Sequence, residues 1–196
     1  MKKIELIVTC AAANSAGFAS AATGAIWPLT ATTPGDHLGH LLTLKNNTAT
    51  DHSAKTALIV GIGPGGEGIT ETLHLPTGST TVSSTQYYAT LTSITPSSTL
   101  GADTMDIGWA VNAVSAWQHC VTNVSVFNLG FGCTVTSGSP TYTVQSSFGD
   151  GTGFNHPTVA SQTTSASGSV GYPIAALRLL FTAAGSVALN ALQTDA

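Results

Sequence analysis

The sequence predicts an all-β protein, and three observations support that fold class. Short segments rich in Val, Ile and Thr alternate between apolar and polar residues, which is the period of a β-strand. Clusters of Gly, Pro, Asn and Ser separate these segments at intervals of about 8–12 residues, as in β-sandwiches and barrels. Helical periodicity is almost absent, because the single weak candidate, 110–117, fits a linker turn as well.

Alternation and turn chemistry define the expected strands one by one. The first, 3–10, resembles a secretory leader, but Glu5 interrupts its apolar residues and favours a strand. Turns are expected at 46–47, 63–66 and 149–151, where Asn and Gly tolerate positive φ. The full set of expected strands is 3–10, 40–45, 57–62, 69–75, 87–94, 104–109, 120–126, 133–137, 141–147, 174–182 and 187–192.

An internal repeat predicts the domain organisation. Shifting the sequence by 84 residues places Gly65 on Gly149 and Tyr88 on Tyr172, and superposes the alternating segments 58–62 and 142–146. The competing explanation is that two β-rich stretches align by chance. We predict two tandem antiparallel β-sandwich modules, jelly-roll or Ig-like, with the division 1–24 for an N-terminal strand or arm, 25–110 for module 1 and 111–196 for module 2.

The low charge content predicts a surface that other proteins cover. Only 7% of the residues are charged and 42% are hydrophobic, whereas a typical soluble domain is about 25% charged. Strand edges without charged residues are sites where another chain can pair, so we expect a homo-oligomer. The net charge of -4 and the absence of a basic run predict no nucleic-acid binding. No apolar run has the length of a membrane span, so no membrane partner is expected.

The histidines offer one candidate metal site. His37 and His40 follow Asp36 and have the spacing of a ligand pair, to which Asp51 or His52 would add a third ligand. The alternative is a polar loop in which Asp36 forms an Asx turn. Nothing nearby extends the ligand pattern, so we predict no metal site. His74, His119 and His156 are isolated in the sequence.

Catalytic and cofactor motifs do not assemble in this sequence. Gly61, Gly63 and Gly66 match a dinucleotide fingerprint, but Pro64 and the strand after it indicate a hairpin. No nucleophile elbow occurs, and the acids are too sparse to define a catalytic pair. We therefore predict that the protein is not an enzyme and has no cofactor. The acids considered are Asp36, Asp51, Glu67, Glu71, Asp103, Asp106 and Asp150.

Aromatic, thiol and guanidinium side chains leave alternatives open. The aromatic residues either line a sugar-binding platform or fill the cores, and we favour the cores. Cys120 and Cys133 either form a disulfide or, like Cys10, remain small buried side chains. Arg178 is expected at an interface or beside acidic groups. The aromatic residues considered are Trp27, Trp109, Trp117, Tyr87, Tyr88 and Tyr142.

Two stretches resemble structural proteins of tailed-bacteriophage virions. The first contains the hairpin 66–73 (GEGITETL) and the strand 87–94 (YYATLTSI), and the second contains 172–179 (YPIAALRL) followed by 185–189 (GSVAL). The resemblance implies a capsid decoration (cement) protein that binds the major capsid protein or other virion proteins, located in the virion. It also leaves open a neck or tail accessory protein, or a fibre protein with a carbohydrate-binding, adhesin role.

Overall fold

A computed structural model describes residues 1–124 and 126–194, and every regular element in them is a β-strand. The predicted all-β class is therefore confirmed. The chain forms two compact units: unit 1 comprises Met1–Ala11 and Val114–Ala196, and unit 2 comprises Ala12–Ala113. The domain boundaries expected after residues 24 and 110 stay a prediction. None of the described residues forms a helix with the length and apolarity that crossing a membrane requires.

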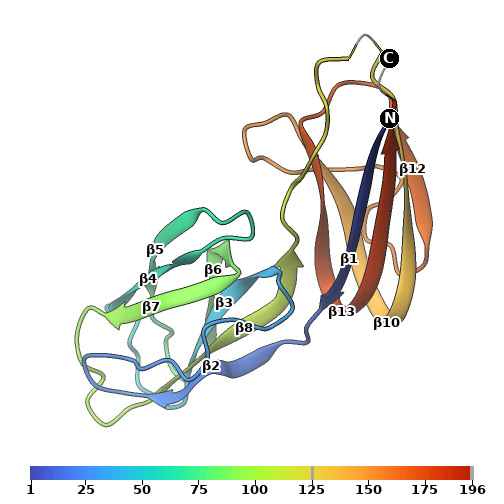
Figure 1. Ribbon diagram of the computed structural model, residues 1–196. Helices are drawn as coiled ribbons and strands as arrows, with labels where there is room; N and C mark the ends of the chain where they lie inside the picture. Colours follow the sequence, from blue (N-terminus) through green and yellow to red (C-terminus); the bar gives the residue numbers. More distant parts are fainter. Residues whose placement is uncertain (125, 195–196) are drawn as a thin grey trace. The chain divides into compact units, whose positions relative to one another are not determined.

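Unit 1 is organised around β13 (Ala176–Gln193), which pairs with β1 (Lys2–Cys10) on one side and with β10 (Leu129–Ser147) on the other. Figure 1 shows β1 beside the C-terminal half of β13. The predicted strand 3–10 is confirmed, and its alternation has the expected effect: Ile4 and Val8 are buried while Ile7 faces solvent. Three shorter strands complete the unit: β9 (Gln118–His119), β11 (Phe154–Asn155) and β12 (Ala166–Val170).

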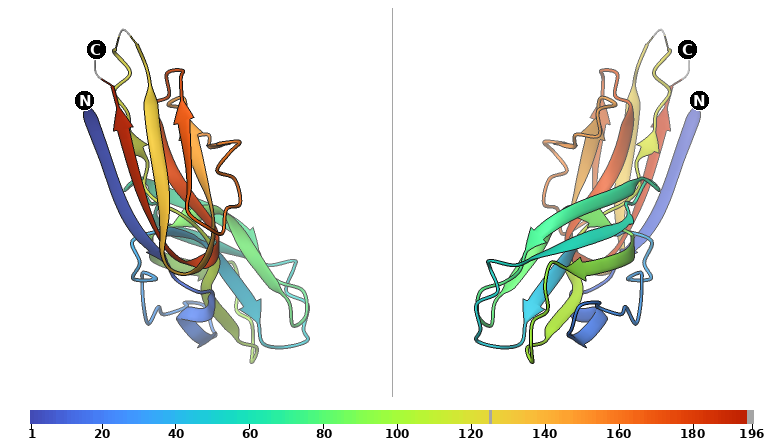
Figure 2. Two further views of the ribbon diagram at one scale, coloured as in Figure 1. Left: turned by 90° about the vertical axis from the view of Figure 1, so that its right-hand side faces the viewer. Right: turned by 90° about the vertical axis from the view of Figure 1, so that its left-hand side faces the viewer.

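Both long strands of unit 1 bend part-way along their length (Figure 2). The β10–β13 ladder shifts register between Val135 and Ser137 and again between Gly138 and Thr141. Bulges of this kind bend a strand without ending it. The prediction of separate strands at 133–137 and 141–147, and at 174–182 and 187–192, is therefore wrong. After the bend, the Tyr142 side chain is buried and its hydroxyl donates to the Thr164 carbonyl oxygen at 2.8 Å.

Unit 2 has two sets of paired strands. In the first, β3 (Gly39–Asn46) lies between β6 (Thr81–Tyr88) and β8 (Met105–Val114), and β2 (Asn14–Ala22) pairs with β8. In the second, β4 (Thr56–Ile62) lies between β5 (Gly68–His74) and β7 (Thr90–Pro96). Buried side chains from both sets form one core, to which Leu42, Ile59, Leu91 and Met105 belong.

Tertiary context overrides several local predictions. The expected strand 87–94 is wrong because the chain changes sheets at Ala89: Tyr88 pairs with His40, whereas Thr90 pairs with Ile62. The described residues of the expected strand 120–126 are irregular, with Ser125 lying outside the described part. Residues 110–114, expected to form a linker turn, continue β8.

The burial of aligned residues does not support the predicted repeat. Gly65 and Gly149 both lie in turns, as the alignment requires. However, Tyr88 is fully buried while its counterpart Tyr172 is 52% exposed. Leu58 is exposed while its counterpart Tyr142 is buried. Equivalent strands of a duplicated sandwich turn the same side chains toward the core, so these pairs are not structurally equivalent.

Candidate functional site

Three exposed aromatic side chains of unit 1 contact one another. Phe148, Phe154 and Tyr172 are 57%, 47% and 52% exposed. The Phe148 ring centre lies 5.5 Å from that of Phe154, in an edge-on arrangement, and 6.1 Å from that of Tyr172, at an interplanar angle of 25°. We call these three residues the aromatic cluster. Large apolar side chains gathered at a surface mark a binding site more often than scattered ones do.

Turn residues place the aromatic cluster. Phe148 directly follows β10, and the next turn contains Gly149 and Gly151, both with positive φ. Asp150 accepts a hydrogen bond from the Thr152 backbone N–H at 3.0 Å, and this bond lowers the pKa of the carboxyl group. The chain then returns as β11, in which Phe154 pairs with Ser146 of β10. Tyr172 follows β12, next to Gly171.

A set of polar side chains lies on β10, β11 and the neighbouring strand β13. Arg178 Nε donates to Gln145 Oε1 at 2.8 Å, and Gln145 Nε2 donates to Asn155 Oδ1 at 2.8 Å. The Arg178 guanidinium stands 4.2 Å from the centre of the Trp117 ring, within cation–π range. Arg178 was expected at an interface or beside acids, and these contacts show an aromatic face and an amide as its partners.

A small hollow adjoins the turn that carries Phe148. Its volume is about 180 Å³, and Trp117, His119, Ser147 and Gly149 contribute to its wall. Ser147 accepts a hydrogen bond from the Gly149 backbone N–H at 3.3 Å. The hollow therefore combines an aromatic face, an imidazole and a hydroxyl close to the exposed rings.

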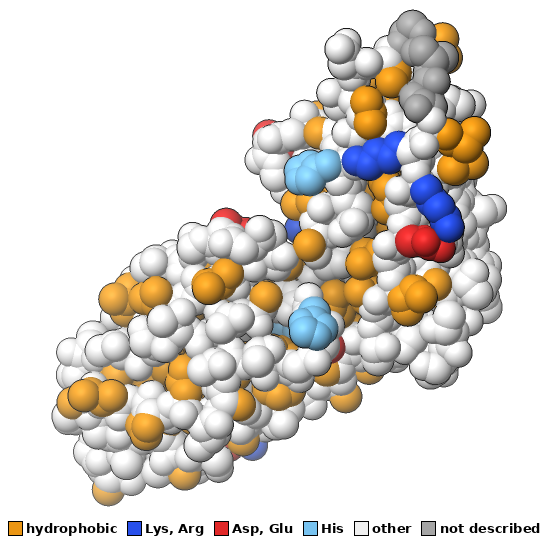
Figure 3. Space-filling view, in the orientation of Figure 1, with side chains coloured by type: hydrophobic (Ala, Val, Ile, Leu, Met, Phe, Trp, Pro, Cys, Tyr) orange, Lys and Arg blue, Asp and Glu red, His pale blue; other side chains and the backbone are white. Residues whose placement is uncertain are grey.

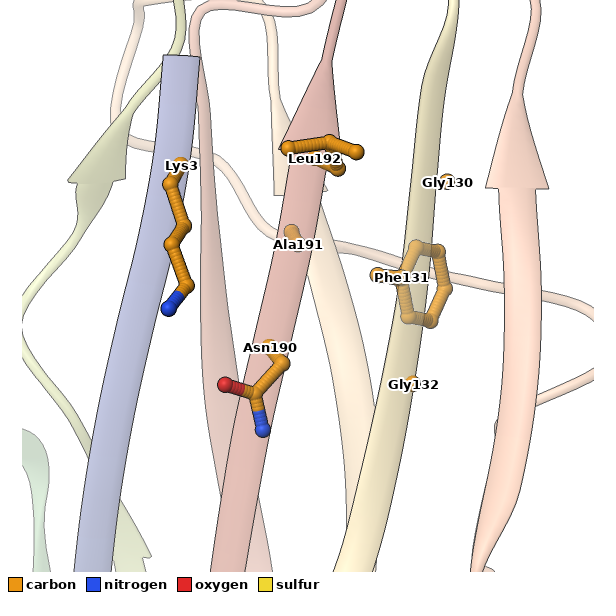
Figure 4. Close-up of a pocket in the computed structure, with 7 residues that line it drawn as sticks. All are labelled: Lys3, Gly130, Phe131, Gly132, Asn190, Ala191 and Leu192. Atoms are coloured by element: carbon orange, nitrogen blue, oxygen red, sulfur yellow. The ribbon is translucent and has the colours of Figure 1, made fainter.

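A second surface of unit 1 is the outer face of the β1–β13–β10 sheet. A shallow trough of about 360 Å³ crosses it, with Lys3, Asn190 and Leu192 on two neighbouring strands and Gly130 and Gly132 on the third (Figure 4). A Cβ at either glycine would meet nothing within 4 Å, so the absence of side chains there leaves the trough open.

The structure gives His40 a structural role. Its Nε2 lies 2.7 Å from Asp36 Oδ2 and its Nδ1 lies 2.8 Å from the Ala110 carbonyl oxygen, so both ring nitrogens have partners within unit 2. Asp36 Oδ1 also accepts from the Leu38 N–H, which is the Asx turn considered as the alternative. His37 is exposed and has a φ of 62°. His40 is thus engaged in holding the loop to β8.

Asp51 and His52, the residues considered as a third metal ligand, also have hydrogen-bond partners in unit 2. His52 is buried and its Nε2 lies 3.0 Å from Asp103 Oδ2. Asp51 accepts a hydrogen bond from the Ser53 N–H at 2.8 Å, which lowers the pKa of its carboxyl group. Both contacts fix the loop between β3 and β4.

Two further acids, Glu71 and Asp106, accept hydrogen bonds from neighbouring strands. Glu71 of β5 accepts from the Thr85 N–H at 2.8 Å, from the Gln86 N–H at 3.3 Å and from the Tyr88 hydroxyl at 3.3 Å. Burial and the Glu71 charge raise the pKa of Tyr88. Asp106 accepts from the Ala21 N–H at 2.8 Å. These acids join strands, and the absence of enzyme activity stays a prediction.

The glycine-rich segment is the predicted hairpin between β4 and β5. Gly63 N–H donates to the Glu67 carbonyl and Gly66 N–H donates to the Gly63 carbonyl, which closes the turn. A strand follows it, so the context of a dinucleotide site is missing at this segment. Cys120 and Cys133 form no disulfide with each other: Cys133 is buried and Cys120 is partly buried.

The preference for core aromatics is confirmed at four positions: Trp27, Trp109, Tyr88 and Tyr142 are buried. The three exposed rings were not predicted from the sequence, because the aromatic residues considered for a sugar platform were tryptophans and tyrosines. The available signal was the placement of Phe148 and Tyr172 beside turn glycines, where a core side chain is not expected.

Comparisons with known protein families, with curated proteins and with solved structures find no match for this chain.

Proposed function

We propose that this protein is a structural component of a tailed-phage virion, a capsid decoration protein that binds the head shell through protein–protein contacts. The observation that carries this proposal is the outer face of the β1–β13–β10 sheet. Ile7 is 74% exposed there and Leu192 is 48% exposed. The two charges of this face, Lys3 and Glu5, form an ion pair at 2.9 Å and neutralise each other.

A face of this kind gains free energy when another protein covers it. Exposed apolar side chains contribute about 25 cal/mol for each Å² removed from water. Its remaining side chains are small or uncharged, among them Thr9, Thr134 and Asn190, so covering them requires little desolvation of charge. Figure 3 shows the same character in its view of the surface, which is mostly white and orange with few red or blue atoms.

The partners follow from the same chemistry. We propose the major capsid protein, other virion proteins and further copies of this chain, since apolar contact with strand-edge pairing suits all three. We also propose that the two compact units are two β-sandwich modules. In support, unit 2 packs two sets of strands on one core, and in unit 1 the side chains of Cys133 and Tyr142, on the two sides of the bend, are both buried.

Particle composition and a surface variant test the proposal together. The protein should copurify with particles and appear as density on the head shell in cryo-electron microscopy. Leu192→Lys should abolish this association, because it buries an unpaired charge. The matched control Leu58→Lys, on an exposed position of unit 2, should leave the association intact.

Copy number distinguishes the finer roles. A decoration protein follows the copy number of the shell, whereas a neck or tail protein is present in few copies. A stable monomer that is absent from particles would contradict the proposal altogether.

A further inference from the structure

We propose that the aromatic cluster of unit 1 is a binding platform for a neutral oligosaccharide. This proposal goes beyond the assembly role and does not depend on it. Its first support is exposure: each of the three rings keeps about half of its surface in contact with solvent, 57%, 47% and 52% for Phe148, Phe154 and Tyr172. A pyranose ring has an apolar C–H face and a hydroxyl edge, so it requires an apolar platform bordered by hydrogen-bonding groups.

The spacing of the rings supports a chain of sugars. Phe148 lies in the middle, with its ring centre 5.5 Å from that of Phe154 and 6.1 Å from that of Tyr172. Both separations are comparable to the length of one hexopyranose unit. The Phe148 and Phe154 planes are inclined by 62° and the Phe148 and Tyr172 planes by 25°, so the cluster is a twisted platform. A sugar chain that turns from one unit to the next can follow it.

Hydrogen-bonding groups border the platform. Thr152 and Asp150 lie in the turn between Phe148 and Phe154, and both are exposed. Hydroxyl and carboxylate groups are suited to the donor and acceptor pattern of sugar hydroxyls.

The local charge selects neutral sugars. Asp150 is an exposed carboxylate, so the turn carries a negative charge at neutral pH and disfavours acidic sugars. Arg178 of the neighbouring strand β13 is engaged by Gln145 and by the Trp117 ring. We therefore expect an uncharged ligand. Equatorial hydroxyls leave the C–H face of a sugar open to an aromatic ring, so a β-1,4-linked glucan is the expected class.

Isothermal titration of the full chain with cellohexaose, chitohexaose and maltohexaose tests the proposal. We expect binding of at least one of the two β-linked probes, with little dependence on salt. Tyr172→Ala and Phe148→Ala should each weaken the affinity about tenfold, the loss expected for a central aromatic contact. Tyr172→Phe keeps the ring and should retain most of the affinity.

Leu58→Ala is the matched control, because it removes a similarly exposed apolar side chain from unit 2, which does not contain the aromatic cluster, and should leave sugar binding unchanged. The melting temperature of each variant shows that the fold is intact. The proposal is overturned if the wild-type chain binds none of the three probes, or if binding survives the double variant Phe148→Ala/Tyr172→Ala.

A protein partner at the cluster is a separate outcome of the same experiment. The wild-type chain could bind none of the three sugars while the double variant changes the sedimentation coefficient. In that case the cluster is an assembly contact and the sugar proposal fails. Failure of the assembly role has a different readout, because Leu192→Lys and particle association report on the outer sheet face alone.

Discussion

Gly185 of β13 lies directly against Pro140 of β10, so closely that a Cβ at position 185 would stand 2.6 Å from Pro140 Cδ. Gly185 also has a φ of 149°, which side chains rarely adopt. The contact lies where the two longest strands of unit 1 bend together. The bend thus depends on a position without a side chain facing a rigid ring.

Gly185→Ala should therefore destabilise unit 1, by about 1–3 kcal/mol, through steric overlap and backbone strain. Urea unfolding monitored by circular dichroism measures the change. The control is Gly130→Ala in β10, where a Cβ meets nothing within 4 Å. That variant should leave stability within about 0.5 kcal/mol of wild type. Equal losses for both variants would show that the bend does not constrain position 185.

Glu71 joins β5 to β6 through hydrogen bonds to Thr85, Gln86 and Tyr88. Glu71→Gln replaces one acceptor oxygen by an N–H₂ donor, which then opposes a backbone N–H or the Tyr88 hydroxyl. We expect a loss of about 1–2 kcal/mol in the unfolding free energy of unit 2, measured in urea. Glu67→Gln, at the exposed hairpin, is the control and should be nearly neutral. A neutral Glu71→Gln would mean that solvent replaces these contacts.

His40 links the loop before β3 to Ala110 through its Nδ1 and to Asp36 through its Nε2. His40→Ala removes both hydrogen bonds from a side chain that is 1% exposed, so we expect a loss of about 2–4 kcal/mol, including the cavity. His74→Ala, at an exposed position with one hydrogen bond to the Ser53 carbonyl, is the control. Thermal melts of both variants give the comparison, and equal melting temperatures would contradict the structural role.

Alkaline pH should weaken unit 1 through Cys133 and Tyr142. Burial raises the pKa of Cys133 from 9.0 to about 12 and that of Tyr142 from 10.0 to about 12. Between these values the unfolded chain releases protons that the folded chain retains. The unfolding free energy must therefore fall as pH rises from about 9 toward 12, and it is unaffected by these groups below that range.

Urea unfolding at a series of pH values across this window measures the effect. Cys133→Ala should make the decline shallower, because it removes one of the two groups from both states. An unchanged slope in that variant would show that the thiol ionises equally in the folded and unfolded chains.

Local pattern was sufficient for some elements and not for others. The strand 3–10 and the turn 63–66 were predictable because alternation and glycine placement are properties of the segments themselves. β2 was missed because Asn14–Ala22 consists mostly of small residues without alternation. Its position depends on a distant partner: a Cβ at Gly17 would stand 2.0 Å from the Trp109 ring. The bend in β10 was predicted as a strand end, because Gly and Pro are typical both of strand ends and of bends within a strand.

Of the two candidate surfaces, one was predictable from the sequence and the other was not. A sheet face with few charges was expected from composition, because 7% charged residues are too few to give every exposed strand a charged surface. The exposed rings were not predicted: the turn glycines beside Phe148 and Tyr172 indicate exposure, but the contact among the three rings depends on tertiary pairing. Buried aromatics such as Trp27 and Tyr88 were expected from their side-chain volume alone.

The position of β1 in the sequence determines when the outer sheet face comes into existence. Leu6 pairs with Leu189, so the first strand of the chain leaves the ribosome long before its partner strand has been made. Residues Ala12–Ala113 are synthesised in the meantime and can fold as a unit before β1 pairs with β13. The face that carries Lys3, Asn190 and Leu192 forms only after residue 192 has been added. A partner that recognises this face therefore selects chains whose synthesis has passed that point.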